Sequence, residues 1–232
     1  MNMLPELSLT EVILEAGQVD LGVSFADVSA QLRTPSEKME QINGQARALR
    51  TFINNSSSHD QLRAIEAMAG SISTLRQYIG LSKVTPVAQL VTHELDAGLD
   101  KIILLCMHRS VIMALRTRLR GYCPVTLFCG TAPAKRKRNL DRFLQKDKYR
   151  ILISHIQAVG VGINGLQQVC DEALVVEGSL VASDTAQAIM RLHCRGQDNA
   201  VNIRFISING IDRHLQMLLC RNVKSIIEKP LL

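Results

Sequence analysis

The sequence predicts an α/β fold in which a largely parallel β-sheet lies between layers of helices. From about residue 83 onward, short apolar runs alternate with segments of helical periodicity. The apolar runs are continuous and do not alternate with polar residues, as expected for strands that are covered on both faces. Strands that alternate with helices in this way form parallel sheets, because a parallel connection needs a crossover, usually a helix.

Each element of this region follows from its own pattern. The expected strands are residues 101–107, 124–128, 150–154, 173–177 and 201–206. The expected helices are residues 86–97, 110–120, 133–146, 184–193 and 211–227.

The chain before residue 83 has a different pattern. Residues 7–16 alternate loosely and are interpreted as an edge strand. Residues 36–54 and 59–78 predict two helices, separated by an Asn-Asn-Ser-Ser-Ser break. We therefore expect a helical N-terminal segment over residues 1–82 and one α/β domain over residues 83–232.

The composition is that of a folded protein. Apolar residues make up 47% of the 232 residues and charged residues 21%, far from a disordered chain. No apolar run reaches the roughly 18 residues of a membrane span, and the N-terminus lacks the pattern of a secretory signal. The net charge of +6 suits a polyanionic partner. With no Trp, three Tyr and five Phe, a stacking platform for unpaired bases is not expected, so phosphate contacts should dominate any nucleic-acid binding.

The six cysteines predict neither disulfides nor a metal site. None forms a C-x-x-C pair, and none lies beside histidines at zinc spacing. Several fall inside apolar runs, such as Leu104-Leu105-Cys106. We expect reduced, buried thiols in a cytoplasmic protein.

Residues 160–165 match the dinucleotide-binding pattern G-x-G-x-x-G. In that motif the first glycine directly follows its strand and the third opens a helix. Here five residues separate Ser154 from Gly160, and only about seven separate Gly165 from the next expected strand. This spacing is too short for a crossover helix and argues against a dinucleotide site.

Two other motifs resemble metal sites, but one lies at the wrong position and the other lacks a ligand. Asp171-Glu172 is similar to the acidic metal-binding pair of ATPases, yet it precedes its strand and so lies at the opposite edge of the sheet from that motif. We expect a solvated turn there. His93-Glu94 begins like a zinc-protease helix, but position 97 is Ala, so the second histidine is absent.

The chain also lacks a phosphate-binding loop. A nucleotide triphosphatase of this class needs a glycine loop that ends in Gly-Lys-Ser/Thr, because backbone amides and the lysine hold the phosphates. No Gly-Lys dipeptide occurs anywhere in the sequence. The chain alone is therefore not expected to make a conventional nucleotide pocket.

Four segments follow one another in an informative order. They are KIILLCMHR (101–109), CGT (129–131) with the basic segment AKRKRNLDRFL, SHIQAVGVGIN (154–164) and QAIMRLHCRGQ (187–197). Their order and spacing resemble the C-terminal lobe of superfamily-2 helicases, specifically Swi/Snf-type DNA translocases. The nearest pattern is the compact bacterial and phage branch, which is similar to annealing helicases. The resemblance runs from about residue 73 to the end, and Leu4-Pro5-Glu6-Leu7 is similar to the linker that follows the first lobe. It implies a RecA-like three-layer sandwich, as in P-loop nucleotide triphosphatases.

The resemblance implies a role in completing an ATP site. In such motors the first lobe holds ATP and Mg²⁺, and the second supplies arginines that stabilise the γ-phosphate. The residues that it assigns to catalysis are Arg191, Arg195 and Gln187, and those that it assigns to the ATP cleft are Gly160, Gly162 and Gln197. On this basis ATP and Mg²⁺ bind only when a first lobe is paired with the chain.

The resemblance also implies contacts with the backbone of double-stranded DNA, without sequence preference. Gly160 and Gly162 are expected to adopt conformations that are closed to other residues, beside a DNA phosphate. The basic helix carries Lys135, Arg136, Lys137, Arg138, Arg142 and Lys146. The implied nucleic-acid-binding residues are Arg109, Gly130, Thr131, Lys135, Arg136, Ser154, Gln157 and Asn164.

Each of these assignments has a simpler alternative. Arg191 would merely pair with a surface acid, the glycines would serve only a turn, and the basic run would be a solvated helix face. Two departures from the family pattern also lie beside one site. The second arginine is expected at position 194, which is Cys, with Arg195 next to it; on a helix, this slip turns the side chain by about 100°. Residues 178–182 read GSLVA where the family has an acidic-Trp-x-Pro run.

Three hypotheses remain open from the sequence. The first is the second lobe of an ATP-dependent duplex translocase, completed by a first lobe in the same or another chain. The second is a catalytically degenerate module that binds DNA or a partner. The third is an unrelated α/β enzyme.

Overall fold

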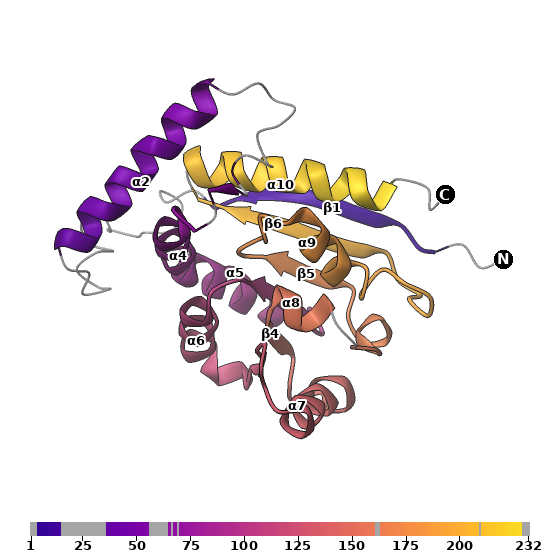
Figure 1. The fold of residues 1–232 in the computed structure, drawn as a ribbon. Helices are drawn as coiled ribbons and strands as arrows, with labels where there is room; N and C mark the ends of the chain where they lie inside the picture. Colours follow the sequence, from indigo (N-terminus) through magenta and orange to yellow (C-terminus); the bar gives the residue numbers. More distant parts are fainter. Residues whose placement is uncertain are drawn as a thin grey trace.

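A computed structural model shows one parallel sheet with helices on both faces, which confirms the expected α/β class (Figure 1). It describes residues 4–14, 36–55, 65, 67–68, 70–160, 163–208 and 210–228. The sheet has six strands in the order β1-β6-β5-β2-β4-β3, and every pairing among them is parallel. The strands are β1 (Leu7–Ile13), β2 (Ile102–Cys106), β3 (Val125–Leu127), β4 (Ile151–His155), β5 (Glu172–Val175) and β6 (Val201–Ser207).

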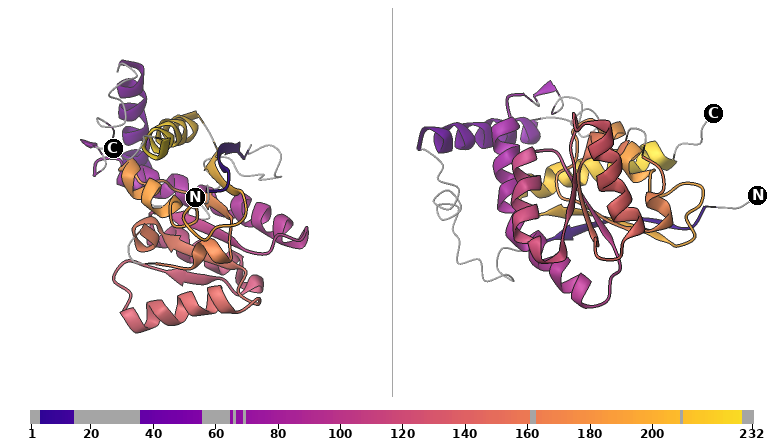
Figure 2. Two further views of the ribbon diagram at one scale, coloured as in Figure 1. Left: turned by 90° about the vertical axis from the view of Figure 1, so that its right-hand side faces the viewer. Right: turned by 90° about the horizontal axis from the view of Figure 1, so that it is seen from below.

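Helices connect the strands and cover the sheet (Figures 1 and 2). They are α2 (Ser36–Asn55), α4 (Ser73–Ser82), α5 (Val84–Asp96), α6 (Arg109–Arg118), α7 (Pro133–Gln145), α8 (Ile156–Gly160), α9 (Ala182–Ile189) and α10 (Gly210–Glu228), with short 3₁₀ turns η1 (Arg120–Tyr122) and η2 (Leu166–Gln168). No helix in the described ranges is long and apolar enough to cross a membrane.

Successive strand residues point to opposite faces, so each apolar strand supplies two cores. In β2, Ile103 and Leu105 pack with residues of α7, α8, α9 and α10. Ile102, Leu104 and Cys106 pack on the other face with residues of α5 and α6. This two-sided burial is the reason that the strands read as continuous apolar runs.

The N-terminal segment adds an edge strand and a third cluster to this body. β1 pairs with β6 along its whole length, from Leu7 opposite Val201 to Ile13 opposite Ser207, which confirms the expected edge strand. A third core joins α2 and α4 to α10 through residues that include Ile42, Leu75 and Leu215. α2 extends outward from the sheet, beside α4 (Figures 1 and 2).

The expected helix over residues 59–78 is confirmed at residues 65, 67 and 73–78, but a turn interrupts it. Residues 59–64 lie outside the described residues. Residues 70–72 form a turn, and α4 begins only at Ser73 and continues to Ser82. Gly70 lies in this turn, and glycine is a poor residue for a helix interior.

All strands run in the same direction, so their carboxyl ends meet at one edge of the sheet. The segments that follow β2, β3, β4 and β5 converge there. In open α/β sheets this edge is where ligands usually bind.

Candidate functional site

Arg191 lies against the segment that follows β4. Its Nε and Nη2 atoms donate to the carbonyl oxygen of Gly160 at 3.2 and 2.9 Å. Among the described residues, no acidic side chain forms an ion pair with it. The structure therefore joins the two motifs by a charged contact to a backbone dipole, in place of the surface ion pair considered as an alternative.

The helix that carries the motif ends earlier than expected. The sequence predicts a helix over residues 184–193, but α9 stops at Ile189. The amides of Arg191 and Leu192 bond to carbonyls three residues back, at Ala188 and Ile189, and so form a turn. Both arginines of the motif thus follow the helix.

Arg195 lies exposed at the end of this turn. Because the helix has already ended, the rotation of about 100° per residue that would carry Arg195 away from Arg191 does not apply here. The carbonyl of Arg195 accepts a bond of 3.5 Å from Gln167 Nε2, and Cys194 Sγ lies 3.7 Å from the carbonyl oxygen of Arg191. These contacts fix the backbone and leave the Arg195 guanidinium at the surface.

Gly160 does not adopt the left-handed conformation that was expected of it. Positive φ angles occur instead at other described glycines, including Gly165 with φ 94°. A Cβ at Gly160 would meet Gln187 at 3.7 Å, which is ordinary contact. Gln187 itself is exposed on α9 beside Gly160. Gly162, for which the same conformation was expected, lies outside the described residues.

Gln197 is buried and fully bonded. Its Nε2 donates to the carbonyls of Cys170 and Leu192, each at 3.2 Å, and its Oε1 accepts from the amide of Asn199 at 3.0 Å. Only 7% of the residue is exposed. Gln197 thus ties the arginine turn to the loops that precede β5 and β6, and both polar atoms of its side chain are bonded within the lobe.

His193 joins the same turn to the N-terminal segment. Its Nε2 lies 2.7 Å from the carbonyl oxygen of Pro5. Its Nδ1 is buried and has no hydrogen-bond partner in the described part of the chain. Arg191 and His193, two positions apart in one motif, therefore contact Gly160 and the chain just before β1.

A buried carboxylate organises the carboxyl edge, and sequence reasoning assigned it no role. Glu177 follows β5 and accepts bonds from the amides of Met107 and His108 at 3.1 and 3.0 Å, while His108 Nδ1 lies 2.7 Å from it. The carboxylate thus lies at the N-terminus of α6, where the helix dipole favours negative charge. A Cβ on Gly80 would come within 2.1 Å of Glu177 Oε1, so this position needs glycine.

A second buried charge pair lies beside it. Lys83 Nζ lies 2.8 Å from Asp212 Oδ1 and donates to the carbonyls of Val176 and Ile206 at 2.9 and 2.8 Å. Burial raises the pKa of the Asp212 carboxyl, and the charge of Lys83 opposes that shift. Lys83 therefore links α5 and α10 to the ends of β5 and β6.

Arg76 completes this group by donating to the carbonyl of Gly178 at 2.5 Å. Burial lowers the pKa of Arg76, against the nearby charges of Glu177 and Asp212. The available sequence signal was a charged residue at the end of an apolar run, as at Glu177, and a lysine between apolar neighbours, as at Lys83.

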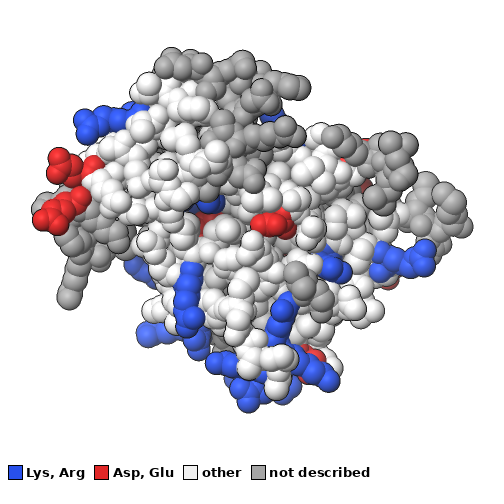
Figure 3. Space-filling model, in the orientation of Figure 1, with Lys and Arg blue, Asp and Glu red and all other residues white. Residues whose placement is uncertain are grey.

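The loops after β2 and β3 form a basic surface. Arg109 lies over the ring of Phe128, 4.9 Å from its centroid. Gly130 has φ 77°, a turn conformation that favours glycine. Arg109, Gly130, Thr131 and Lys135 line one open groove, so the structure brings four of the expected DNA-binding residues together. Lys and Arg gather over this end of the molecule, around α7 (Figure 3).

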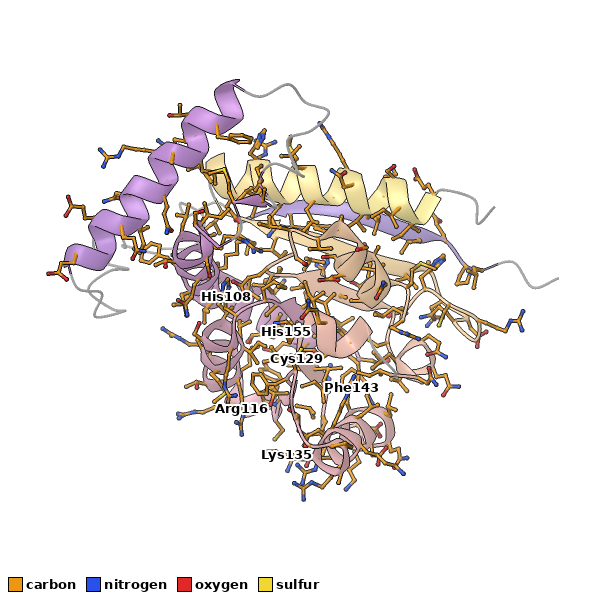
Figure 4. All side chains as sticks on the ribbon, viewed as in Figure 1. His108, Arg116, Cys129, Lys135, Phe143 and His155 are labelled. Atoms are coloured by element: carbon orange, nitrogen blue, oxygen red, sulfur yellow. The ribbon has the colours of Figure 1, made fainter. Side chains whose placement is uncertain are left out.

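Cys129 and His155 lie side by side in this region, between His108 and Lys135 (Figure 4). Cys129 Sγ is 3.3 Å from His155 Nδ1. Burial lowers the pKa of His155, while a hydrogen bond to the Met107 backbone opposes the shift. Ser154, expected to contact DNA, is fully buried, and its hydroxyl donates to the carbonyl of His155.

The other expected DNA-binding residues are not among those that line the groove. Arg136 donates to the carbonyl of Ala158 and so fastens α7 to α8. Gln157 Nε2 donates to Asp184 Oδ2 at 3.0 Å. Asn164 is exposed.

The acidic pair Asp171-Glu172 lies at the start of β5, on the amino edge of the sheet as its position predicted, and Glu172 is paired. Arg204 Nη2 lies 2.8 Å from Glu94 and 3.3 Å from Glu172, and Asn202 also donates to Glu172. The role expected for Glu172, a solvated turn, is therefore wrong, since its carboxylate joins an ion-pair network. Within the described ranges, no group of three or more His, Cys, Asp or Glu is arranged to hold a metal ion.

Solved structures share this fold. Aligned over 97% of this chain and 99% of the other, the C-terminal part of the Fun30 ATPase domain is similar with a TM-score of 0.59 at 15% identity. The Sulfolobus solfataricus SWI2/SNF2 ATPase core in complex with dsDNA gives 0.61 at 16% identity, over 96% of this chain and 46% of that chain. The separate C-terminal domain of the Sulfolobus ATPase gives 0.53 at 13% identity, over 97% and 90%.

The chain thus spans about half the length of the Sulfolobus core, 46%, and nearly all of the Fun30 C-terminal part, 99%. No protein-family profile and no curated protein sequence matches it. The chain has the fold of the second, RecA-like lobe of SWI2/SNF2 ATPases, which confirms the fold that the four motifs implied.

Proposed function

We propose that the chain is the second motor lobe of an ATP-dependent double-stranded DNA translocase of the Swi/Snf type. It would supply arginines to an ATP site and contacts to the DNA backbone. A first lobe, in the same or another chain, would hold ATP and Mg²⁺, because no Gly-Lys dipeptide exists here to form a phosphate loop.

The contact between Arg191 and Gly160 carries this proposal. A guanidinium bonded to a backbone carbonyl is held in place, yet its charge is not cancelled by an acid. Such a group can exchange a carbonyl for a phosphate oxygen, and its planar fork suits that acceptor. When bound by a first lobe, ATP would supply the phosphoryl group, and a fixed arginine stabilises the charge that develops during transfer.

The basic end of the sheet supports the DNA contacts. α6 and α7 both begin at the carboxyl edge, beside Arg109 and Thr131, and helix N-termini attract phosphate. Arg109 and Lys135 add positive charge around the same groove. Duplex DNA bound through these residues would be recognised by its phosphates, independently of sequence.

The second candidate function is a binding module that holds DNA or a protein and hydrolyses nothing. The observation in its favour is that Cys194 occupies the position of the second arginine. This alternative needs the basic groove but not the arginine turn.

ATP hydrolysis by the full chain, alone and with the first lobe of a SWI2/SNF2 ATPase, separates the two. We expect no hydrolysis by the chain alone and DNA-stimulated hydrolysis by the pair. Arg191→Ala should lower the rate of the pair by about 10²–10³, as for other fixed charge-stabilising groups. The exposed Arg118 gives the control Arg118→Ala, which should leave the rate unchanged.

Hydrolysis by the chain alone, or a fully active Arg191→Ala pair, would overturn the proposal. No hydrolysis by the pair, together with retained binding to duplex DNA, would establish the binding module instead.

A further inference from the structure

An open groove with a volume of about 610 Å³ runs between α6 and α7, along the outer side of the edge strand β3. Only its carboxyl end holds residues assigned above to DNA. The remaining lining residues have no role so far.

The cations of the groove form two rows, one on each wall. On α6, Arg109 and Arg116 are seven residues apart and line the groove together with Met113 between them. On α7, Lys135, Arg138 and Arg142 repeat at intervals of three and four residues and so share one helix face. No Asp or Glu is among the described residues that line the groove.

The spacing of each row suits a strand of linked phosphates. Seven helical residues span about 10 Å, which equals roughly the rise of three nucleotides along one strand. Both helices begin at the carboxyl edge and run back toward the amino edge, so the rows extend along the whole groove.

An arginine stacked on a ring lies at each end. Arg109 covers Phe128, which follows β3, and Arg142 lies 5.9 Å from the centroid of the Tyr149 ring, just before β4. Guanidinium planes and aromatic rings are the surfaces on which unpaired bases stack. A duplex cannot use them, because its bases are already stacked on one another. The low aromatic content of the sequence argued against such a platform. Composition does not show, however, that two of the few aromatic rings, Phe128 and Tyr149, line the same groove.

The edge of β3 is poorly suited to an added peptide strand. β3 has only three residues, and the carbonyl of its central residue, Thr126, already accepts a bond of 3.1 Å from Asn139 Nδ2. A side chain that occupies an edge carbonyl blocks the pairing that peptide addition requires.

We infer that this groove holds a single unpaired DNA strand, continuous with the duplex contacts at its carboxyl end. This inference takes from the proposed function only the position of the duplex at the carboxyl end of the groove. Binding of the unpaired strand itself needs neither ATP nor a first lobe.

The test is fluorescence anisotropy on the full chain, with a short blunt duplex and the same duplex carrying an oligothymidine tail. The wild-type chain should bind the tailed duplex more tightly. Arg116→Gln with Arg142→Gln should weaken binding of the tailed duplex by about tenfold and lower its log–log salt slope by about 1.4, roughly 0.7 for each lost single-strand phosphate contact. The blunt duplex should change by less than about twofold.

Two further variants sharpen the test. Arg118→Gln with Lys137→Gln removes the same charge from exposed positions that do not line the groove, and it should leave the preference for the tail intact. Tyr149→Leu keeps the positive charges and removes one ring, and it should weaken binding of the tail by about tenfold.

The inference is overturned if the groove variant binds the tail normally, if blunt and tailed duplexes weaken equally, or if a polyglutamate peptide displaces the tail as well as free oligothymidine does. If the wild-type chain binds the tailed duplex but not the blunt duplex, the result counts against the proposed duplex translocase and supports the groove assignment.

Discussion

His193 Nε2 lies 2.7 Å from the carbonyl oxygen of Pro5, so the arginine turn is bonded to the chain just before the first strand. A carbonyl only accepts, and Nε2 must therefore carry the proton. Residues 4–7 resemble the linker after a first lobe. In a two-lobe motor this bond would connect the linker to the turn that holds Arg191.

His193→Ala should loosen this connection. Loss of one hydrogen bond, worth about 1 kcal/mol, should speed amide hydrogen exchange in residues 4–14 by about fivefold. Mass spectrometry of exchanged peptides measures this rate. The exposed His93 offers the control His93→Ala, and equal exchange in both variants would show that the bond does not hold the segment.

Lys83→Met should be strongly destabilising. It leaves Asp212 buried without its partner charge, and such losses cost about 3–5 kcal/mol. The free energy of unfolding in urea measures the cost. Lys83→Met combined with Asp212→Leu should recover part of it, because both charges are then gone while the carbonyls of Val176 and Ile206 still lack the lysine donor. A double variant as unstable as the single one would contradict this account.

The sequence predicted the strands well because burial on both faces leaves a continuous apolar run. It missed the end of α9 for a physical reason. Ile189 and Leu192 are both buried, so the helical pattern of apolar residues continues through the turn, while the amides of Arg191 and Leu192 already bond to carbonyls three residues back. The bonds of Lys83 span 93 and 123 residues, and no local pattern records them.

His155 should make stability depend on pH. Burial lowers its folded pKa below the ordinary 6.5, opposed by the Met107 backbone and Glu177. The unfolded chain therefore binds more protons, so this contribution is present above about pH 6.5 and is lost as pH falls through the lowered folded value. Unfolding free energies from pH 7.5 to 5 should fall less steeply for His155→Gln than for the wild-type chain. His214, whose pKa is also lowered by burial, is present in both. Parallel curves would show that His155 is not responsible.

Gly178→Ala should destabilise the loop after β5. An added Cβ would come within 1.7 Å of Leu219 Cδ2, a buried side chain in the core. Overpacking of this kind costs about 1–3 kcal/mol. Thermal unfolding should show a clear loss for this variant and little for Gly121→Ala, where nothing lies within 4 Å. Similar melting temperatures would mean that Leu219 moves aside freely.

Arg195 can be tested in the pair reconstituted with a first lobe. Because it lies in a turn, we expect it to act as the second arginine, and Arg195→Gln should lower ATP hydrolysis by about 10². Adding Cys194→Arg to that variant should restore activity if the only requirement is an arginine side chain that can extend to the ATP phosphate. Unchanged hydrolysis in Arg195→Gln would leave Arg191 as the sole arginine in this role.

The pairing of β1 with β6 affects where a shortened version of this lobe can begin. The seven residues of β1 form the edge strand next to β6, although nearly ninety residues separate them from β2. A shortened protein that begins at the apparent domain start would expose the backbone amides and carbonyls of β6 to solvent. Exposed sheet edges of this kind pair with strands of other molecules. Such a truncation should self-associate, and the useful starting point for isolated expression lies before Pro5.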